Sequence, residues 1–358
     1  MKRINIRPLI AVLFFIAFVF STSAQRRTVL EIGTGSYLGF CPDIETHRIN
    51  LRLNNPNAIL LECHVSDSME FVDGLSLANA MFGSYPSGLI DRYKFASESN
   101  VDVSRNNWDG IVDEREGMTP IVNVDVINQY WNPQTREVTA TLEATFLSDE
   151  AGDFRFNLFV VEDSVTGIGP GYDQTNYYNG SVGHIYYLAG DPIIGYVHRN
   201  VERAFLGGTW GTQGVIPGTV SNGSTYTIDY SYTLPSNYNE NQIYLVPIVQ
   251  HFSSSLEDRE ILNANITPLQ LSFAGNDELA QNQFNLFPNP TSGVFTLQFE
   301  DVQPSVKIIL KNNLGQIIAN SFYTKTRSIE ASIEETKGVY YLEVITESDF
   351  QIVKIVKQ

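Results

Sequence analysis

Residues 28–43, TVLEIGTGSYLGFCPD, decide the fold of the N-terminal part of the chain. An apolar run that suits a buried strand leads to Tyr37, then to Cys41 and Pro42. The segment that begins at Pro42, PDIETHRINLRLNN, is predicted to be helical, because proline suits a first helical turn. The stretch resembles an aromatic-C-x-x-C-proline motif at the start of a helix, with Leu38 in place of the first cysteine.

Strand and helix patterns alternate on either side of this motif up to about residue 117. AILLECHV and SGLIDRY are expected to form strands, and LSLANAMF and NNWDGIVDERE are expected to form helices. This alternation predicts crossover units and a sheet with helices packed on it.

The period of the apolar residues changes to two between Thr119 and about Phe273. VTATLEATF, FRFNLFV and YTIDYSY all alternate apolar and polar side chains. Half-buried antiparallel strands produce this pattern, which predicts a β-sandwich. A polar linker at 274–283 leads to a last strand-rich block, residues 284–358. There VKIILKNNLGQIIA and GVYYLEVITESDFQIVKIVKQ are each expected to form a hairpin.

The N-terminus has the pattern of a secretory signal peptide over residues 1–24. Three basic residues precede the apolar run LIAVLFFIAFVF, and small residues end at Ala24. The mature protein is expected to begin at Gln25. No later stretch is long and apolar enough to predict a transmembrane span.

The chain is acidic, with a formal net charge of −17. Such a surface repels phosphate backbones and anionic lipid, so nucleic acid is excluded as a partner. It would suit cations such as Ca²⁺, or it keeps an extracellular protein soluble, which is the simpler interpretation.

The last block resembles a known family. LFPNPTSGVFTLQF, KNNLGQII, KGVYYLEV and the terminal KIVKQ are similar, in this order, to the C-terminal sorting domain of type IX secretion cargo in the Bacteroidetes. The resemblance implies a small β-sandwich over 284–358, with the type IX secretion machinery as its partner. It also implies passage through the periplasm to the outer-membrane surface or the medium.

The part before the linker resembles the outer-membrane-protein-28-type surface proteins of the Bacteroidetes. EIGTGSYLGFCPDIETHRI, GLSLANAMFGSYPSGLIDR, VVEDSVTG and YVHRNVERAFLGGTWGTQG carry this resemblance. It implies a multidomain α/β and all-β chain, with a thioredoxin-like domain at 26–117 and an antiparallel β-sandwich at 118–273.

The thioredoxin-like interpretation gives roles to a few residues. Leu38 takes the place of the nucleophilic cysteine and Cys41 that of the resolving cysteine, so the two-cysteine cycle is unavailable within the motif. GSYPSG places Pro86 between a helix and a strand, where such proteins hold a cis-proline. We therefore expect the Tyr85–Pro86 bond to be cis. Cys41, with Pro86 beside it, is the one catalytic candidate, as a single-cysteine thiol-disulfide oxidoreductase.

The only two cysteines, Cys41 and Cys63, leave three alternatives open. They are two buried free thiols, a structural disulfide in an oxidising compartment, or a reactive Cys41. His64 follows Cys63, but adjacent strand residues point to opposite faces, so the two cannot simply pair. A structural role for His64 is the simpler interpretation, although it could approach Cys41 from the strand end.

Other candidate sites are short patterns. Asp109 and Asp113 share a helix face and Asp163 begins a Gly/Asp/Asn-rich loop, which makes them Ca²⁺ candidates without calcium-loop spacing. Ser68 and Ser164 follow aspartates and precede apolar residues, as in Bacteroidetes O-glycosylation sites. His47, His184, His198 and His251 show no metal-ligand spacing. No cofactor is predicted, because no phosphate loop or nucleophile elbow is present.

The sequence leads to two hypotheses for the function of the protein. The first is a non-catalytic binding or adhesion-type protein at the cell surface, with an extracellular protein or glycan as its ligand. Aromatic residues of the sandwich would supply the contact surface, namely Tyr172, Tyr177, Tyr178, Tyr186, Tyr187 and Trp210. The second is the single-cysteine oxidoreductase acting through Cys41.

Overall fold

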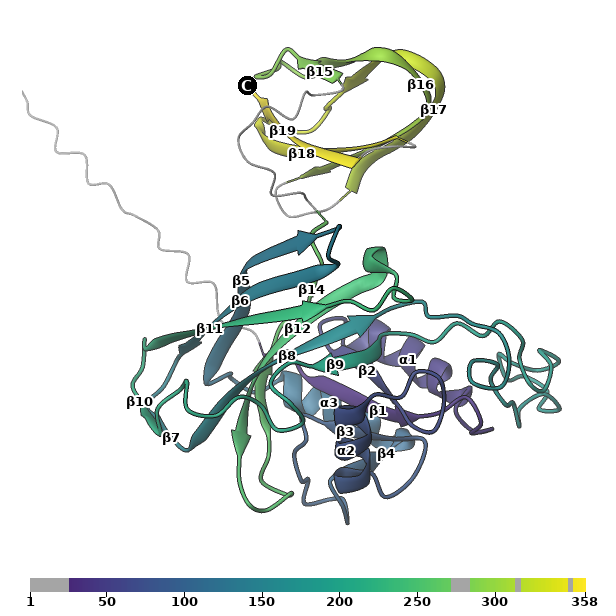
Figure 1. The fold of residues 1–358 in the computed structure, drawn as a ribbon, viewed down its shortest axis with the longest axis vertical. Helices are drawn as coiled ribbons and strands as arrows, with labels where there is room; N and C mark the ends of the chain where they lie inside the picture. Colours follow the sequence, from purple (N-terminus) through teal and green to yellow (C-terminus); the bar gives the residue numbers. More distant parts are fainter. Residues whose placement is uncertain (1–25, 272–283, 313–316, 347–349) are drawn as a thin grey trace, which may run out of the picture. The chain divides into compact units, whose positions relative to one another are not determined.

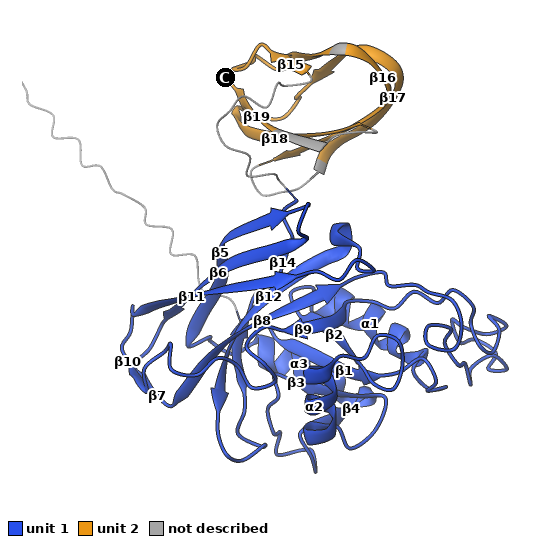
Figure 2. Ribbon diagram, viewed as in Figure 1, with its two compact units in different colours: residues 1–271 blue, residues 272–358 orange. Residues whose placement is uncertain are grey.

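The structure is a computed structural model that describes residues 26–271, 284–312, 317–346 and 350–358. The signal peptide at 1–24, the mature start at Gln25 and the linker at 274–283 lie outside the described residues. The chain divides into two compact units, residues 1–271 and 272–358, which are coloured separately in Figure 2. None of the helices in the described segments is long and apolar enough to cross a membrane.

The first unit begins with strands and helices in alternation (Figure 1). β1 runs parallel to β2, β3 is antiparallel to β1, and β4 is antiparallel to β3. β1 and β2 are buried along their whole length, as their Val, Ile and Leu content predicts. The elements are β1 (Val29–Thr34), α1 (Asp43–Asn54), β2 (Ile59–His64), α2 (Val72–Met81), β3 (Ser87–Ile90), β4 (Asp102–Ser104) and α3 (Trp108–Glu116).

Helices cover both faces of this part of the sheet. Leu30 and Ile32 of β1 pack with the buried residues of α1 and α3, whereas Val29 packs with those of α2. The alternation of side chains along a strand thus divides the core into two layers. The helices and strands expected between residues 28 and 117 are all present.

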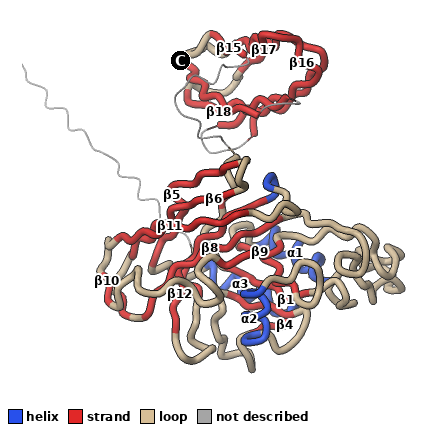
Figure 3. The backbone as a smooth tube through the Cα atoms, viewed as in Figure 1, coloured by secondary structure: helices blue, strands red, loops and turns tan. Residues whose placement is uncertain are grey.

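The following part adds strands to the same sheet and builds a second sheet, as Figure 3 shows. β13, β12, β8 and β9 continue the first sheet, whose order is β13-β12-β8-β9-β2-β1-β3-β4, with β14 paired to β12. β11, β6 and β5 form a separate three-stranded sheet, and β7 pairs with β10. The strands are β5 (Val122–Asn132), β6 (Glu137–Phe146), β7 (Glu150–Ala151), β8 (Asp153–Glu162), β9 (Val201–Phe205), β10 (Thr219–Val220), β11 (Thr225–Thr233), β12 (Ile243–Phe252), β13 (Ile261–Ala264) and β14 (Thr267–Pro268).

The two sheets enclose an apolar core. The alternate residues of β6 from Val138 to Phe146 are buried, and they pack against Phe156, Leu158 and Val160 of β8. This is the sandwich that the period of two predicts. The opposite face of β8 is buried too, since Phe159 and Val161 pack with β2 and α2. The first sheet therefore crosses the boundary expected at 117/118, through the pairing of β9 with β2.

The second unit is a five-stranded β-structure with its own core. β16 pairs with β17, and β18 pairs with β19, in the two expected hairpins. Residues 313–316 and 347–349, between the paired strands, lie outside the described residues. The strands are β15 (Phe284–Phe287), β16 (Val294–Asn312), β17 (Ile317–Ser332), β18 (Gly338–Thr346) and β19 (Phe350–Lys357).

Candidate functional site

The motif segment, residues 36–43, leaves the end of β1 and leads into α1. It folds as consecutive turns, in which the Leu38 amide donates to the Gly35 carbonyl and the Cys41 amide donates to the Leu38 carbonyl. Tyr37 and Phe40 are about half exposed, whereas Cys41 is buried. The motif thus presents its aromatic rings to solvent and turns its thiol inward.

A long irregular segment between β8 and β9, residues 163–200, lies over the motif segment. We call it the β8–β9 lobe; it stands beside α1 in Figure 1. The Thr175 amide donates to the Ser36 carbonyl at 2.8 Å, and the Tyr177 amide donates to the Gly39 carbonyl at 2.9 Å. Gln174, which is buried, donates from its side chain to the Leu38 carbonyl at 2.9 Å. The lobe is therefore hydrogen-bonded to the segment at which a redox motif would act.

Gly39 allows this close approach. A Cβ atom at this position would lie 2.3 Å from the Tyr177 ring. The Tyr177 ring in turn meets the Phe40 ring edge-on, with centroids 5.1 Å apart. Glycine at position 39 is therefore a packing requirement of the lobe rather than a feature of a redox motif.

A polar network joins α1 to the lobe beneath these rings. Asp43 accepts a hydrogen bond from Arg105 at 2.7 Å and lies 3.3 Å from His184. The His184 ring stacks on Tyr178, with centroids 4.0 Å apart. Burial acts to raise the pKa of Asp43, but the hydrogen bonds from Arg105 and His184 outweigh it and lower that pKa. An ionised Asp43 thus anchors the lobe to the start of α1.

The setting of Cys41 disfavours its thiolate form. It is 2% exposed, and burial raises its thiol pKa to about 11, although a thiolate is needed for attack on a disulfide. The Tyr85–Pro86 bond is cis. Pro86 lies next to the end of β1, because Ser87 pairs with Gly33.

Cys63 is also a free, buried thiol. It packs with the α2 layer, whereas Cys41 packs with the α1 and α3 layer on the opposite face of the sheet. The structure therefore holds two separate buried thiols, the first of the three alternatives, and contains no Cys41–Cys63 disulfide. Burial raises the pKa of Cys63 well above its usual range.

The solvent-facing side of the lobe is rich in large apolar side chains. Tyr177 is 61% exposed and Val182 is 84% exposed. Exposed apolar side chains in one segment are candidates for a contact surface. The exposed side chains of the lobe are Ile168, Tyr177, Val182, Ile185, Tyr187, Leu188, Ile194 and Val197; together with Tyr37 and Phe40 of the motif segment we call them the lobe surface.

The aromatic residues proposed as a contact surface divide between exposed and packed positions. Tyr177 and Tyr187 are exposed and belong to the lobe surface. The other four are partly buried, and Trp210 stacks against the Arg259 guanidinium, 4.1 Å from its ring centroid. The packed four are Tyr172, Tyr178, Tyr186 and Trp210.

The remaining predicted site residues do not assemble into a site. In the described part of the chain, Asp109, Asp113 and Asp163 belong to no group of three or more metal-ligating side chains. Asp163 accepts hydrogen bonds from the Asn200 amide and the Ser164 hydroxyl. Ser164 also accepts one from Arg199, whereas Ser68 is exposed.

The structure brings together one cluster that the sequence patterns miss. Glu62, His64 and His198 lie within reach of one another at the junction of β2 and the lobe, and all three are buried. The residues come from distant parts of the chain, so no spacing motif in the sequence identifies them. The only available signal is the alternation in β2, which places Glu62 and His64 on one face.

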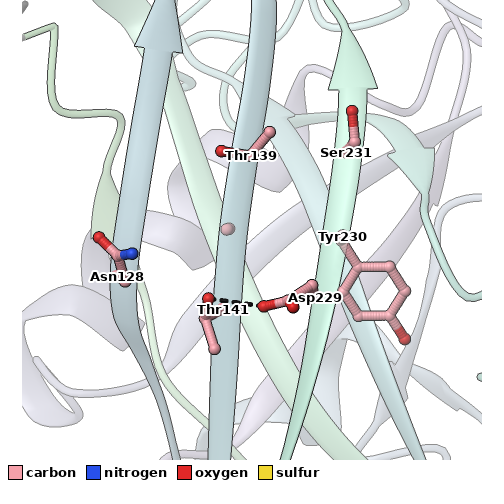
Figure 4. A pocket seen from close by; sticks show the side chains of 7 residues that line it. Asn128, Thr139, Thr141, Asp229, Tyr230 and Ser231 are labelled. Atoms are coloured by element: carbon pink, nitrogen blue, oxygen red, sulfur yellow. Dashed lines mark hydrogen bonds between the residues drawn. The ribbon is translucent and has the colours of Figure 1, made fainter. Parts of the chain in front are cut away.

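The outer face of the three-stranded sheet carries a shallow polar hollow (Figure 4). Thr141 donates a hydrogen bond to Asp229 across two of its strands at 2.7 Å. Short hydroxyl and amide side chains provide little apolar contact area, so the lobe surface is the better candidate for a partner. The hollow is lined by Asn128, Thr139, Ala140, Thr141, Asp229, Tyr230 and Ser231.

Comparisons with known proteins show which families the sequence matches. The sequence model of the family described as "Outer membrane protein Omp28" matches residues 78–265, more than half of the chain. That of the "Secretion system C-terminal sorting domain" matches residues 285–358. No curated protein sequence matches.

Solved structures give a similar answer for the fold. HBP35 of Porphyromonas gingivalis has a TM-score of 0.54 at 15% identity, covering 93% of this chain and 99% of its own. A protein of Agrobacterium tumefaciens has a TM-score of 0.42 at 14% identity, covering 70% of this chain and 98% of its own. At these identities only the first likeness bears on the fold, and neither bears on function.

Proposed function

The chain belongs to the Omp28 family of outer membrane proteins, and from this premise we propose that it is a non-catalytic protein-binding protein of the cell surface. Its sorting domain directs it to the outer-membrane or cell surface through type IX secretion. Within this proposal the binding surface is the lobe surface, and the partner is an extracellular protein.

A thioredoxin-like scaffold at residues 26–117 is part of the proposal. The local strand order β2-β1-β3-β4 supports it, with one parallel crossover followed by two antiparallel strands. The placement of α1 and α3 on one face, opposite α2, supports it as well. The sandwich at 118–273 shares the sheet of this scaffold. The lobe leaves this sheet at the end of β8 and returns to it at the start of β9.

The single observation that carries the non-catalytic role is the lobe over the motif segment. Two backbone hydrogen bonds and the Gln174 side chain join the lobe to residues 36–39. They occupy the backbone beside the position of the missing nucleophile, Leu38. An oxidoreductase needs that surface open to its substrate, whereas a scaffold can cover it.

A protein is the partner that the lobe surface favours. Its exposed groups are mainly aliphatic and aromatic, and burial of such area is the main source of affinity between proteins. A glycan would call for aromatic rings flanked by many free polar groups. In this lobe the side-chain amides of Asn176 and Asn179 are engaged with its own backbone.

Site-specific photo-crosslinking on living cells tests the proposal. A photoreactive phenylalanine analogue replaces Tyr177 in the full chain, and a matched variant carries it at Tyr130, an exposed tyrosine of β5. We expect a discrete adduct only at position 177, and protease treatment should digest the added mass. A protease-resistant adduct would identify a glycan, and adducts equal at both positions or absent from both would overturn the proposed surface.

A further inference from the structure

Three metal-ligating side chains meet where the lobe rejoins the sheet. Glu62 and His64 belong to β2, and His198 lies near the end of the lobe. Their ligand atoms lie within 4.8 Å of one another. Paired backbone hydrogen bonds between Val165 and His198 close the base of the lobe and fix the position of His198.

The hydrogen bonds of the two histidines fix their tautomers. His64 Nδ1 lies 2.7 Å from a carboxylate oxygen of Asp67, and His198 Nε2 lies 2.8 Å from the Tyr172 carbonyl oxygen. Both oxygens accept, so both of these nitrogens carry hydrogen. When the rings are neutral, their lone pairs are on His64 Nε2 and His198 Nδ1.

The Nε2 atom of His64 and a carboxylate oxygen of Glu62 lie close enough to share a cation. They are 3.3 Å apart; without a metal a protonated His64 donates to this oxygen, whereas the neutral ring and the carboxylate can bind one metal ion together. No hydrogen bond among the described residues uses His198 Nδ1. Two ligands of a tetrahedral zinc ion, at bond lengths of about 2.0–2.1 Å, lie about 3.3 Å apart, which is the separation found for His64 and Glu62.

We propose that Glu62, His64 and His198 bind a divalent transition-metal ion, with Zn²⁺ as the best match to two imidazoles and one carboxylate. The outer contacts support this assignment. Histidine ligands characteristically donate their second N–H to a carboxylate or a backbone carbonyl, as His64 does to Asp67 and His198 does to Tyr172.

The charges around the cluster agree with a bound cation. Arg48 pairs with the other Glu62 oxygen. Asp67 adds a second carboxylate at the same place. Two carboxylates thus stand against one guanidinium, which favours a further cation between them.

The ion would tie the lobe to the sheet. Two ligands come from β2 and the third comes from the lobe, whose Tyr172 also holds the His198 ring. All three ligands are buried, so the ion would be enclosed as the lobe closes. Loss of the ion would therefore loosen residues 163–200 while the sheet stays folded.

The test uses the untagged full chain purified from its host, because a histidine tag would itself bind metal. We expect one zinc ion per chain by elemental analysis. After dialysis against a chelator, Zn²⁺ should raise the melting temperature and Mg²⁺ should not. Co²⁺ should give the visible absorption of tetrahedral coordination, and chelation should speed proteolysis within 163–200.

Three variants locate the ion. His198→Gln should lose the Co²⁺ spectrum, and Asp67→Asn should weaken Zn²⁺ binding by about 10- to 100-fold. His251→Gln is the matched control, a histidine that also faces a carboxylate, Asp258, and it should bind as the wild type does. Circular dichroism checks that each variant is folded.

The proposal is overturned by folded wild-type protein that holds no zinc and gains no stability from Zn²⁺. It is also overturned if His251→Gln, but not Asp67→Asn, weakens binding. If His198→Gln does not fold, the Zn²⁺ affinity of Asp67→Asn and the number of zinc ions per wild-type chain still test the proposal. None of these readouts depends on the partner of the lobe surface, so the two proposals can fail separately.

Discussion

Cys41 shows at the scale of one residue that a sequence motif does not determine the setting of its thiol. The aromatic residue, the cysteine and the proline stand in the expected order, but the thiol is buried and its pKa is about 11. With an ordinary pKa of 9.0, the same thiol would hold about 100 times more thiolate at neutral pH.

We therefore predict that native Cys41 resists alkylation. Iodoacetamide at pH 8 should label neither Cys41 nor Cys63 on the timescale that labels both in denaturant, with Cys41 slower by about 100-fold or more. Mass spectrometry of the intact chain and of its peptides measures this. Because both thiols are free, prior reduction should change nothing in the denatured sample. Rapid native labelling of Cys41 would contradict the buried position and revive the oxidoreductase.

A second residue-scale prediction concerns two buried glutamates on the α2 side of the sheet. Arg92 forms a two-pronged pair with Glu31, with contacts of 2.6 and 2.7 Å, and both are fully buried. Glu202 is equally buried and takes part in no salt bridge of the described residues. Burial and the nearby Glu31 raise the Glu202 pKa well above its usual range, which favours the protonated carboxyl.

The same substitution should then have opposite consequences at the two positions. Glu31→Gln leaves the Arg92 charge buried and unpaired, which should lower the free energy of unfolding by about 3–5 kcal/mol. Glu202→Gln replaces one neutral group by another, so its cost should stay below about 1 kcal/mol. Urea unfolding of both variants measures the contrast, and equal costs would contradict it.

The pH dependence follows from the raised Glu202 pKa. Between the ordinary carboxyl value of 4.5 and the folded value, the folded state binds more protons than the unfolded state. The contribution of Glu202 to the free energy of unfolding is therefore complete below pH 4.5 and is lost as pH rises toward the folded pKa. The Glu202→Gln variant has no such contribution to lose. Its free energy of unfolding should therefore rise relative to that of the wild type as pH rises above that value. A constant difference would mean an unshifted Glu202.

At the scale of elements, the sequence predicts the strands and hairpins that form within one segment of the chain. The alternation in β6 and the apolar runs of β1 and β2 identify their strands, and the last block shows both of its hairpins. The sequence does not show that β8 is buried on both faces, because Arg155 and Asn157 give it the alternation of a half-buried strand. Nor does it show the lobe, whose place depends on hydrogen bonds between Tyr177 and Gly39 and between Gln174 and Leu38. The Glu62, His64 and His198 cluster depends on the same placement.

Asn176 allows a test of the lobe as an element. It is 1% exposed, and its side chain donates to the carbonyls of Tyr186 and Gly190 and accepts from the Tyr178 amide. Asn176→Ala should leave these groups without hydrogen-bond partners, which lowers the free energy of opening the lobe by about 1–3 kcal/mol. The sheet should stay unchanged. The lobe should then open locally.

Limited proteolysis reads this opening directly. Cleavage between residues 177 and 190 should become about 5- to 150-fold faster, because 1.4 kcal/mol corresponds to a factor of ten. Asn50→Ala, on the exposed face of α1, is the control and should leave the rate unchanged. Equal acceleration of cleavage within the sheet strands would mean that Asn176 supports the whole unit instead.

At the scale of the whole molecule, the two units have separate cores. The apolar residues of β15 to β19 pack only with one another in their cluster, around Phe295, Leu342 and Ile355. Family membership divides in the same way, since residues 78–265 and 285–358 match different families. Export and binding should therefore be separable properties of this chain.

Removal of residues 284–358 should block export while leaving the first unit folded. The truncated chain should accumulate in the periplasm and resist external protease on intact cells, because the secretion machinery reads the deleted unit. Leu342→Asp is a sharper variant: it places a charge at a fully buried position of the second unit, which should unfold that unit alone. In both cases the urea transition of the first unit should match that of the wild type. A truncated chain that reaches the surface would place the export signal in the first unit, and a weakened transition would show that the units stabilise one another.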